Sequence, residues 1–339
     1  MDSIAVKVIR GDVVESVHRA SIAVVDARGR LVASFGNPTL VSFMRSSAKP
    51  MQAVPLIESG AADRFGFGEK ELAIADGSHN GEPRHLDLVD NMLRTIGLGP
   101  DSLRCGRHAP MGKEAAVAVG EKYDARHHNC SGKHAGMLAV CVHKGWDTPT
   151  YQSPDHPLQQ EILRVASQET GVPVGEIPIA VDGCGVPTFA VPVQAAARVY
   201  ARLVDPSAIN GQRRETLERI RDAMRKQPFF VAGTERLDTD LMRAAKGNLI
   251  VKAGAEAYFC AGLVKEKRGI AIKIEDGNMR AMPAAMVGTL KEIGAADAQF
   301  LAATKNHWDG PVKNVVGRAV GRYESTIKLV HSAPRNIAA

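Results

Sequence analysis

Hydrophobic and polar residues alternate at the two ends of the chain, whereas the middle has helical spacing. Between Ile4 and Phe35, three short apolar runs, IAVKVI, SIAVVDA and RLVASF, are separated by turn residues. This alternation predicts an antiparallel meander. Three later runs, LIVKAG, AYFCAGLV and GIAIKIE, predict a second group of strands, with a turn at residues 276–278. From Pro311 onwards the strand patterns are weak.

Apolar residues recur at helical spacing after Phe43, through MRSSAKPMQAVPLIESG, where Pro50 suits a first turn and Gly60 a C-terminal stop. Further helices are predicted at residues 69–76, 83–96, 113–121, 133–144, 157–170, 189–203, 206–226, 238–245 and 281–293. Strands at both ends predict an α+β fold, in which the N- and C-terminal segments share an antiparallel sheet flanked by helices. The middle, roughly residues 60–230, forms a helical lobe, and residues 1–339 read as a single domain because no repeat or low-complexity linker divides them.

The charge and cysteine content limit the partners and the compartment. The 43 Lys and Arg exceed the 37 Asp and Glu by six and are scattered, which argues against a nucleic-acid partner but would help to attract an acidic small substrate. No apolar stretch approaches the about 18 residues of a membrane helix, and Met1-Asp2-Ser3 does not begin a secretion signal. Five cysteines in so long a chain predict reduced thiols and a cytoplasmic protein.

The first candidate for chemistry is Ser46 with Lys49, which lie on one face of a predicted helix start. A lysine can deprotonate a serine only if burial and nearby cations lower its pKa from about 10.4 towards roughly 7–8. The helix start also offers N–H groups to a developing oxyanion. The alternative is a capped, solvated helix start, since Ser325 and Lys328 show the same spacing by chance.

Three other segments carry candidate groups. The loop DGSHNGEPRH at residues 76–85 is a polar turn between two helices, typical either of binding groups or of an N-cap made by Ser78 or Asn80. Cys130 and Cys184 lie in polar or Gly-rich turns and resemble metal ligands, but without CxxC or HExxH spacing they could equally be small loop residues. Lys252, at the end of an apolar strand, is either a second base or a solvated strand-end lysine.

Taken together, these segments resemble the L-asparaginase II family, the thermolabile rhizobial type. Seven blocks in chain order carry the resemblance: FMRSSAKPMQ at 43–52, DGSHNGEPRH at 76–85, CGRHAP at 105–110, HHNCSGKHAGML at 127–138, VDGCGVPTFA at 181–190, KAGAEA at 252–257 and VKNVVGRAVG at 312–321. The resemblance implies a fold like that of serine β-lactamases and glutaminases. It implies hydrolysis of the side-chain amide of L-asparagine to L-aspartate and ammonia by a cytoplasmic homodimer.

The family resemblance also implies roles for particular residues. Two Ser-Lys pairs, Ser46 with Lys49 and Ser78 with Lys252, would meet in one site, and the roles of the two serines could be exchanged. A zinc ion would be held by Cys130, Lys133 and Cys184, with water completing the shell, and would orient the substrate rather than activate water. Substrate contacts or adjustment of the lysines would fall to Arg45, His79, Asn80, His134, Asp182 and Glu256.

Other functions stay open at this point. A glutaminase, β-lactam hydrolase or peptide hydrolase of the same fold would also carry SxxK, although the SDN loop and KTG strand of β-lactamases have only the loose analogues SHN and KAG here. A zinc-dependent amidohydrolase would activate water with Cys130, Cys184 and a histidine, leaving the serines as bystanders. A non-enzymatic amino-acid sensor would keep the pocket without turnover.

Overall fold

The computed structural model describes residues 3–332. Within that range the strands form two sheets. The strands of the larger sheet are β1 (Ile4–Arg10), β2 (Val13–Asp26), β3 (Leu31–Phe35), β7 (Leu249–Gly254), β8 (Tyr258–Leu263), β9 (Arg268–Ile274), β10 (Pro311–Lys313), β11 (Ala319–Ser325) and β12 (Val330–His331). They follow the order β10-β11-β1-β2-β9-β8-β7, while β3 pairs with both β2 and β12.

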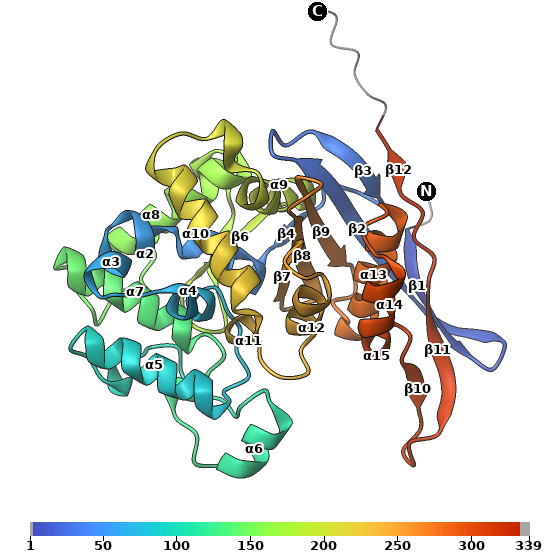
Figure 1. Cartoon of the computed structure of the whole chain (residues 1–339), viewed down its shortest axis with the longest axis horizontal. Helices are drawn as coiled ribbons and strands as arrows, with labels where there is room; N and C mark the ends of the chain where they lie inside the picture. Colours follow the sequence, from blue (N-terminus) through green and yellow to red (C-terminus); the bar gives the residue numbers. More distant parts are fainter. Residues whose placement is uncertain (1–2, 333–339) are drawn as a thin grey trace, which may run out of the picture.

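The two ends of the chain meet in this sheet, as the sequence predicts. β1 pairs antiparallel with β2 on one side and with the C-terminal β11 on the other. β2 also pairs antiparallel with β9, with Ala20 opposite Ile274 and Asp26 opposite Arg268. The weak strand patterns after Pro311 therefore correspond to real strands, and β10 and β11 form one edge of the sheet (Figure 1). The predicted α+β class is confirmed.

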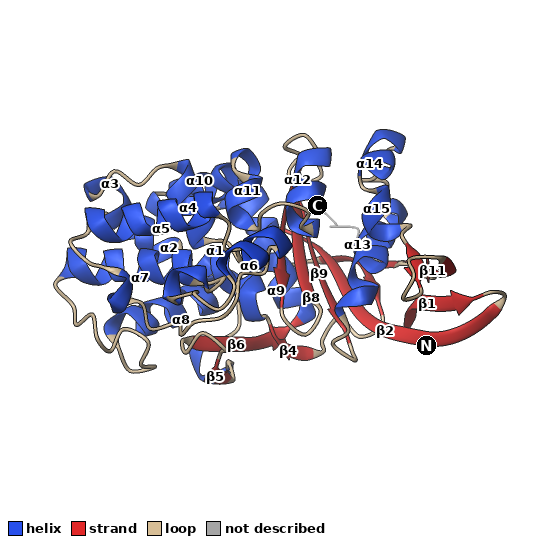
Figure 2. Cartoon of the chain, turned by 90° about the horizontal axis from the view of Figure 1, so that it is seen from below, coloured by secondary structure: helices blue, strands red, loops and turns tan. Residues whose placement is uncertain are grey.

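The middle of the chain is helical and gathers beside the sheet, on the left in Figures 1 and 2. Its α-helices are α1 (Lys49–Gln52), α2 (Val54–Glu58), α3 (Ala61–Arg64), α4 (Glu69–Ala75), α5 (Pro83–Thr95), α6 (Lys113–Val119), α7 (Ser131–Lys144), α8 (Pro157–Thr170), α9 (Val193–Val204), α10 (Gln212–Lys226), α11 (Pro228–Val231) and α12 (Leu237–Ala244). Three more follow the last central strand: α13 (Met282–Glu292), α14 (Ala298–Ala303) and α15 (Lys305–Trp308).

One predicted helix, residues 189–203, begins later than the sequence indicated. Residues Pro187–Pro192 form strand β6, which pairs with β4 (Val41–Phe43) and β5 (Ile179–Val181) in the smaller sheet. A short apolar run such as PTFAVP suits a buried strand as well as a helix. The helix α9 starts only after Pro192 and packs against β9, where Gly269 leaves room for the carbonyl of Ala197.

The helical pattern after Phe43 is broken into short pieces. A 3₁₀ turn, η1 (Arg45–Ala48), leads into α1 and α2, with Pro50 in the first turn of α1. Gly60 ends the run with a φ of 86°, a left-handed conformation that glycine adopts readily. Within residues 3–332, none of the helices has both the length and the apolar character needed to cross a membrane.

Candidate active site

The site forms where the edge strand β7 meets η1. Gly254, at the end of β7, has no side chain because a Cβ there would lie 2.6 Å from the carbonyl oxygen of Met44. This close approach lets the Ser47 hydroxyl donate a 2.9 Å hydrogen bond to the Lys252 carbonyl. The packing fixes η1, and with it Ser46 and Lys49, beside the end of β7.

A second close approach brings the loop after α4 to the same place. A Cβ on Gly77 would lie 2.6 Å from the carbonyl oxygen of Phe230, so only glycine fits between α4 and α11. The next amide, that of Ser78, donates a 2.8 Å hydrogen bond to the Val231 carbonyl. The backbone thereby holds Ser78 against α11.

Lys49 joins these two segments. Its Nζ lies 2.9 Å from the Oγ of Ser78 and also donates to the carbonyl of Gly77. The lysine is fully buried and Ser78 is 4% exposed. Burial lowers the pKa of Lys49, with the charge of Lys133 acting in the same direction and the Cys130 side chain opposing it. A buried amine with a lowered pKa is suited to accept a proton from a serine.

Ser46 is arranged differently from Ser78. It is half-buried, and within residues 3–332 its hydroxyl makes no hydrogen bond. The residue before it, Arg45, has a φ of 51°, which is uncommon for a residue with a side chain. The sequence paired Ser46 with Lys49 and Ser78 with Lys252, whereas the hydrogen bond seen here joins Lys49 to Ser78 and leaves Ser46 open to a ligand.

Lys252 is the second buried amine of the site. Its Nζ donates a 2.6 Å hydrogen bond to the Ala253 carbonyl and lies 4.0 Å from Oδ1 of Asp238, which also accepts the Ala253 amide. Burial lowers the pKa of Lys252 to about 7, although the charge of Asp238 opposes the shift. Lys252 is therefore able to exchange a proton near neutral pH.

Cys130, Lys133 and Cys184 come together next to Lys49. The Lys133 Nζ lies 3.2 Å from the Cys184 Sγ. A hydrogen bond with Cys130 and the charge of Lys133 lower the pKa of Cys184 to about 5. Burial acts to lower the pKa of Lys133, but the sulfur charges outweigh it and raise that pKa. The pair is thus an ammonium facing a thiolate.

These three residues are the ones that could hold a metal ion. Within residues 3–332, no three His, Cys, Asp or Glu side chains are grouped as a metal site, so the Lys133 amine is needed as a third donor. Two thiolates and a nitrogen match the donors that zinc prefers. The residues fit the expected ion, provided that Lys133 loses its proton on binding.

Arg45 and Asp182, both expected near the substrate, bind each other. The Arg45 Nε donates a 2.7 Å hydrogen bond to Oδ1 of Asp182. Burial raises the pKa of Asp182, but the charges of Lys133 and Arg45 outweigh it and lower that pKa. The ion pair links η1 to the turn that carries Cys184.

Two histidines expected to bind substrate lie inside the scaffold. His79 is fully buried; its Nδ1 accepts the Gly81 amide and its Nε2 lies 2.8 Å from the Ser131 hydroxyl. His134 is also fully buried, with Nδ1 2.5 Å from the Tyr151 hydroxyl, and burial lowers its pKa to about 3. Within the described residues, the Nε2 of His134 has no hydrogen-bond partner.

The last two residues expected to contact the substrate, Asn80 and Glu256, lie in different segments. The Asn80 side chain is buried and bonded to Glu82, the Thr234 carbonyl and Arg236, so it shapes the loop that carries Ser78. Glu256 is exposed in the turn after β7, with a φ of 56°. Its backbone carbonyl accepts the Lys273 Nζ.

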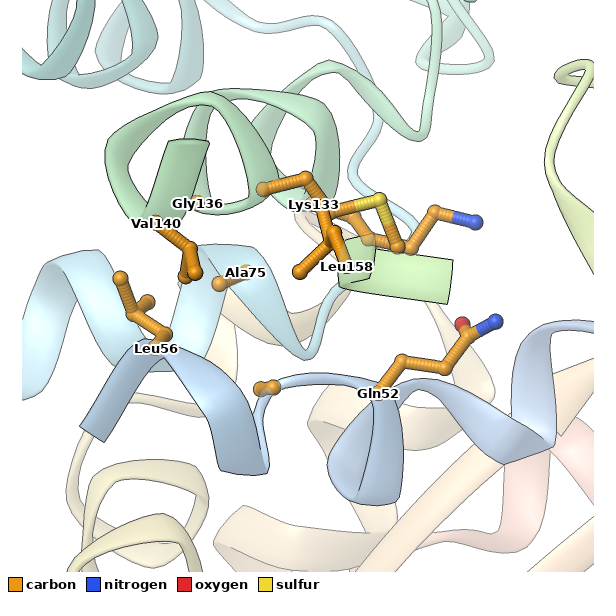
Figure 3. Close-up of a pocket in the computed structure, with 9 residues that line it drawn as sticks. Gln52, Leu56, Ala75, Lys133, Gly136, Val140 and Leu158 are labelled. Atoms are coloured by element: carbon orange, nitrogen blue, oxygen red, sulfur yellow. The ribbon is translucent and has the colours of Figure 1, made fainter. Parts of the chain in front are cut away.

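A small cavity lies beside Lys133 (Figure 3). Its volume is about 10 Å³, and its walls come mainly from apolar residues of α2, α7 and α8. Figure 3 shows the polar ends of Lys133 and Gln52 directed to the same side. A space of this size holds about one water molecule, so it is not the substrate pocket.

Three acidic or basic groups near the site have no role in the sequence predictions. Asp76 is fully buried, and within residues 3–332 neither carboxylate oxygen has a hydrogen-bond partner. Burial raises the pKa of Asp76 well above its usual range, while Lys252 and Lys49 oppose the shift. Asp238 and Arg236 flank the start of α12. Of these, only Asp76 lies in a segment that the sequence singled out.

Comparison with known proteins places the chain in a family. The sequence profile of the family described as L-asparaginase II matches residues 6–325, so the chain belongs to that family. It is accordingly a hydrolase of the amidohydrolase type. No curated protein matches the chain.

Solved structures resemble the fold at low sequence identity. A β-lactamase from Mycobacterium bovis is 14% identical over 80% of this chain and 94% of that one, with a TM-score of 0.37. Simvastatin synthase from Aspergillus terreus is 11% identical over 80% and 91%, with a TM-score of 0.40. A putative β-lactamase from Bacteroides dorei is 11% identical over 85% and 93%, with a TM-score of 0.36. Two of the three are named as β-lactamases.

Proposed function

We propose that the protein hydrolyses the side-chain amide of L-asparagine to L-aspartate and ammonia through an ester on a serine. Family membership supports an amidohydrolase. The observation that carries the mechanism is the fully buried Lys49, with its lowered pKa, bonded at 2.9 Å to the hydroxyl of Ser78. Ser46, three residues before Lys49, is half-buried, and among the described residues its hydroxyl has no hydrogen-bond partner, so it can meet a substrate.

In the first step Ser46 attacks the amide carbon. A neutral Lys49 has one lone pair and two N–H groups, so it can keep its bond to the Gly77 carbonyl and accept the proton of Ser78. Ser78 in turn takes the proton of Ser46. The oxyanion is held by backbone amides, among them that of Ser46, and the proton returns to the departing nitrogen as ammonia leaves.

In the second step water hydrolyses the ester. Lys252, with a pKa lowered to about 7, is our candidate for the group that removes a proton from this water. The Asp238 carboxylate at 4.0 Å stabilises the ammonium that results, and the proton then passes to the Ser46 oxygen as the ester bond breaks. Arg45, Asp182 and Glu256 are candidates for contacts with the polar ends of the substrate.

A zinc ion held by Cys130, Lys133 and Cys184 would supply a fixed positive charge that orients the substrate. The thiolate of Cys184, with its pKa lowered to about 5, is ready to bind a cation near neutral pH. The homodimer and the cytoplasmic location remain predictions from the family resemblance.

The experiment that tests the function measures ammonia release by the purified protein from L-asparagine and L-glutamine, and the colour change of a chromogenic β-lactam. We expect ammonia release from asparagine at a rate well above that from glutamine. We expect no colour change with the lactam. Equal rates on asparagine and glutamine would make the protein a general amidase of this fold. Binding of asparagine without release would indicate a sensor.

A further inference from the structure

Arg236 approaches the backbone of Ser78 from the loop before α12. Its Nη1 donates a 3.0 Å hydrogen bond to Oδ1 of Asn80 and lies 3.4 Å from the carbonyl oxygen of Ser78. Its charge also acts to lower the pKa of Lys252. A guanidinium group is therefore held at the junction of the serine loop and the second lysine.

Arg236 differs from Arg45, Lys133 and Lys252 because, among the described residues, it has no negatively charged partner. Arg45 is paired with Asp182 at 2.7 Å, Lys133 with Cys184 at 3.2 Å and Lys252 with Asp238 at 4.0 Å, while Lys49 is bonded to Ser78. Within residues 3–332, Arg236 forms no ion pair, and its Nε and Nη2 make no hydrogen bonds. It is half-buried.

The loop that carries Arg236 is anchored before any ligand arrives. Oε1 of Glu82 accepts the Thr234 amide at 2.8 Å and the Asn80 amide group at 2.9 Å. One edge of the guanidinium is thus tied to the scaffold through Asn80. The remaining N–H groups form a preorganised fork that can bind a carboxylate.

The geometry of the proposed substrate matches this arrangement. In asparagine, the amide carbon and the α-carboxylate carbon are joined by three single bonds of about 1.5 Å each. The hydroxyl and the carbonyl oxygen of one serine are separated by a similarly short path. A substrate with its amide at the Ser46 and Ser78 hydroxyls can therefore reach the guanidinium at the Ser78 carbonyl with its carboxylate.

We propose that Arg236 binds the α-carboxylate of the amino-acid substrate. This assignment rests on the proposed function, because it requires a substrate that carries a carboxylate next to the scissile amide. It also gives the site a reason to reject simple amides. Arg45, which is already neutralised by Asp182, is less suited to this role.

The test compares L-asparagine with 3-aminopropanamide, which is asparagine without its carboxylate. We expect Arg236→Gln to raise the KM for asparagine on the order of 100-fold with little change in kcat. Its kcat/KM for 3-aminopropanamide should stay within about threefold of the parent, and Arg236→Lys should recover part of the loss. Arg243→Gln, at an exposed arginine in the last turn of α12, is the matched control.

Calorimetry gives a second readout that needs no turnover. The product L-aspartate should bind the parent more tightly than β-alanine does, and Arg236→Gln should remove that difference. Equal losses with both amides, or an unchanged KM for asparagine, would overturn the assignment and leave Arg236 a scaffold residue. Failure of the parent to release ammonia from asparagine at all would instead overturn the proposed function.

Discussion

The Nζ of Lys49 lies 2.9 Å from the Oγ of Ser78, although the two residues are 29 positions apart in the chain. Their contact depends on two glycines, Gly254 and Gly77, that allow three segments of backbone to meet. Burial at the meeting point lowers the pKa of the lysine. The reactivity of the site therefore follows from packing rather than from the local SxxK sequence.

Replacing Lys49 tests its role as the base. We expect Lys49→Met to lower kcat by about 10²- to 10⁴-fold, because in the described part of the chain no other group bonds the Ser78 hydroxyl. Lys113→Met, at an exposed lysine of α6, should leave ammonia release unchanged. Circular dichroism checks that both variants are folded. A folded Lys49→Met protein with more than a tenth of the parent rate would contradict the assignment.

The pH dependence should report Lys252. Its folded pKa of about 7 is below its ordinary 10.5, so the amine is charged below about pH 7 and neutral above it. If Lys252 acts as a base, kcat rises through this pH range. In the unfolded chain Lys252 keeps its proton up to about pH 10.5. Burial of Lys252 therefore destabilises the folded state below about pH 7, and this destabilising effect decreases as the pH rises from about 7 to about 10.5.

The variant Asp238→Asn tests whether Lys252 is the group that titrates in the pH profile of kcat. The Asp238 charge raises the pKa of Lys252, so its removal should move the acid limb of the kcat profile to lower pH. The asparagine oxygen can still accept the Ala253 amide. A limb that does not move, or that moves to higher pH, would show that another group titrates.

Metal content tests the proposed zinc ligands. We expect Cys130→Ser and Cys184→Ser to lose bound zinc, measured by plasma mass spectrometry, while Cys141→Ala, buried near the C-terminal end of α7, keeps it. Chelation should raise the KM for asparagine more than it lowers kcat. Complete loss of turnover in a folded, chelated protein, with Ser46→Ala still active, would favour the metallohydrolase alternative.

Gly254→Ala tests the packing that builds the site. The added Cβ would lie 2.6 Å from the Met44 carbonyl oxygen and 3.0 Å from the Ser47 Oγ, so β7 and η1 must separate. We expect a loss of about 1–3 kcal/mol in the free energy of unfolding, together with lower activity. Gly99→Ala, with nothing within 4 Å and a φ of −123°, is the control. Urea titration compares the two, and equal stabilities would refute the packing argument.

Much of the fold could be predicted from periodicity alone. The meander at the N-terminus, the three central strands and most long helices follow alternating or helical patterns that local sequence encodes. The strand Pro187–Pro192 could not be separated from the helix after it, because its apolar run has no distinctive period. Its partner, Val41–Phe43, is far away in the sequence.

The site was harder to predict than the fold. The sequence singled out Lys49, Ser78 and Lys252 and paired Lys49 with Ser46 by local spacing, but it could not predict the hydrogen bond between Lys49 and Ser78, because helix geometry says nothing about contacts across 29 positions. Arg236 carried no signal, because one arginine before a helix is ordinary. Its proposed role depends on the absence of a carboxylate partner within residues 3–332, which only the folded structure reveals.

The most direct test of the central claim is labelling with a diazo-ketone analogue of asparagine, followed by intact mass spectrometry and mapping of the modified residue. The account predicts a single adduct on Ser46 that forms rapidly in the parent and is lost in Lys49→Met. An adduct on a cysteine, or one that forms at the parent rate without Lys49, would contradict activation of a serine by the buried amine.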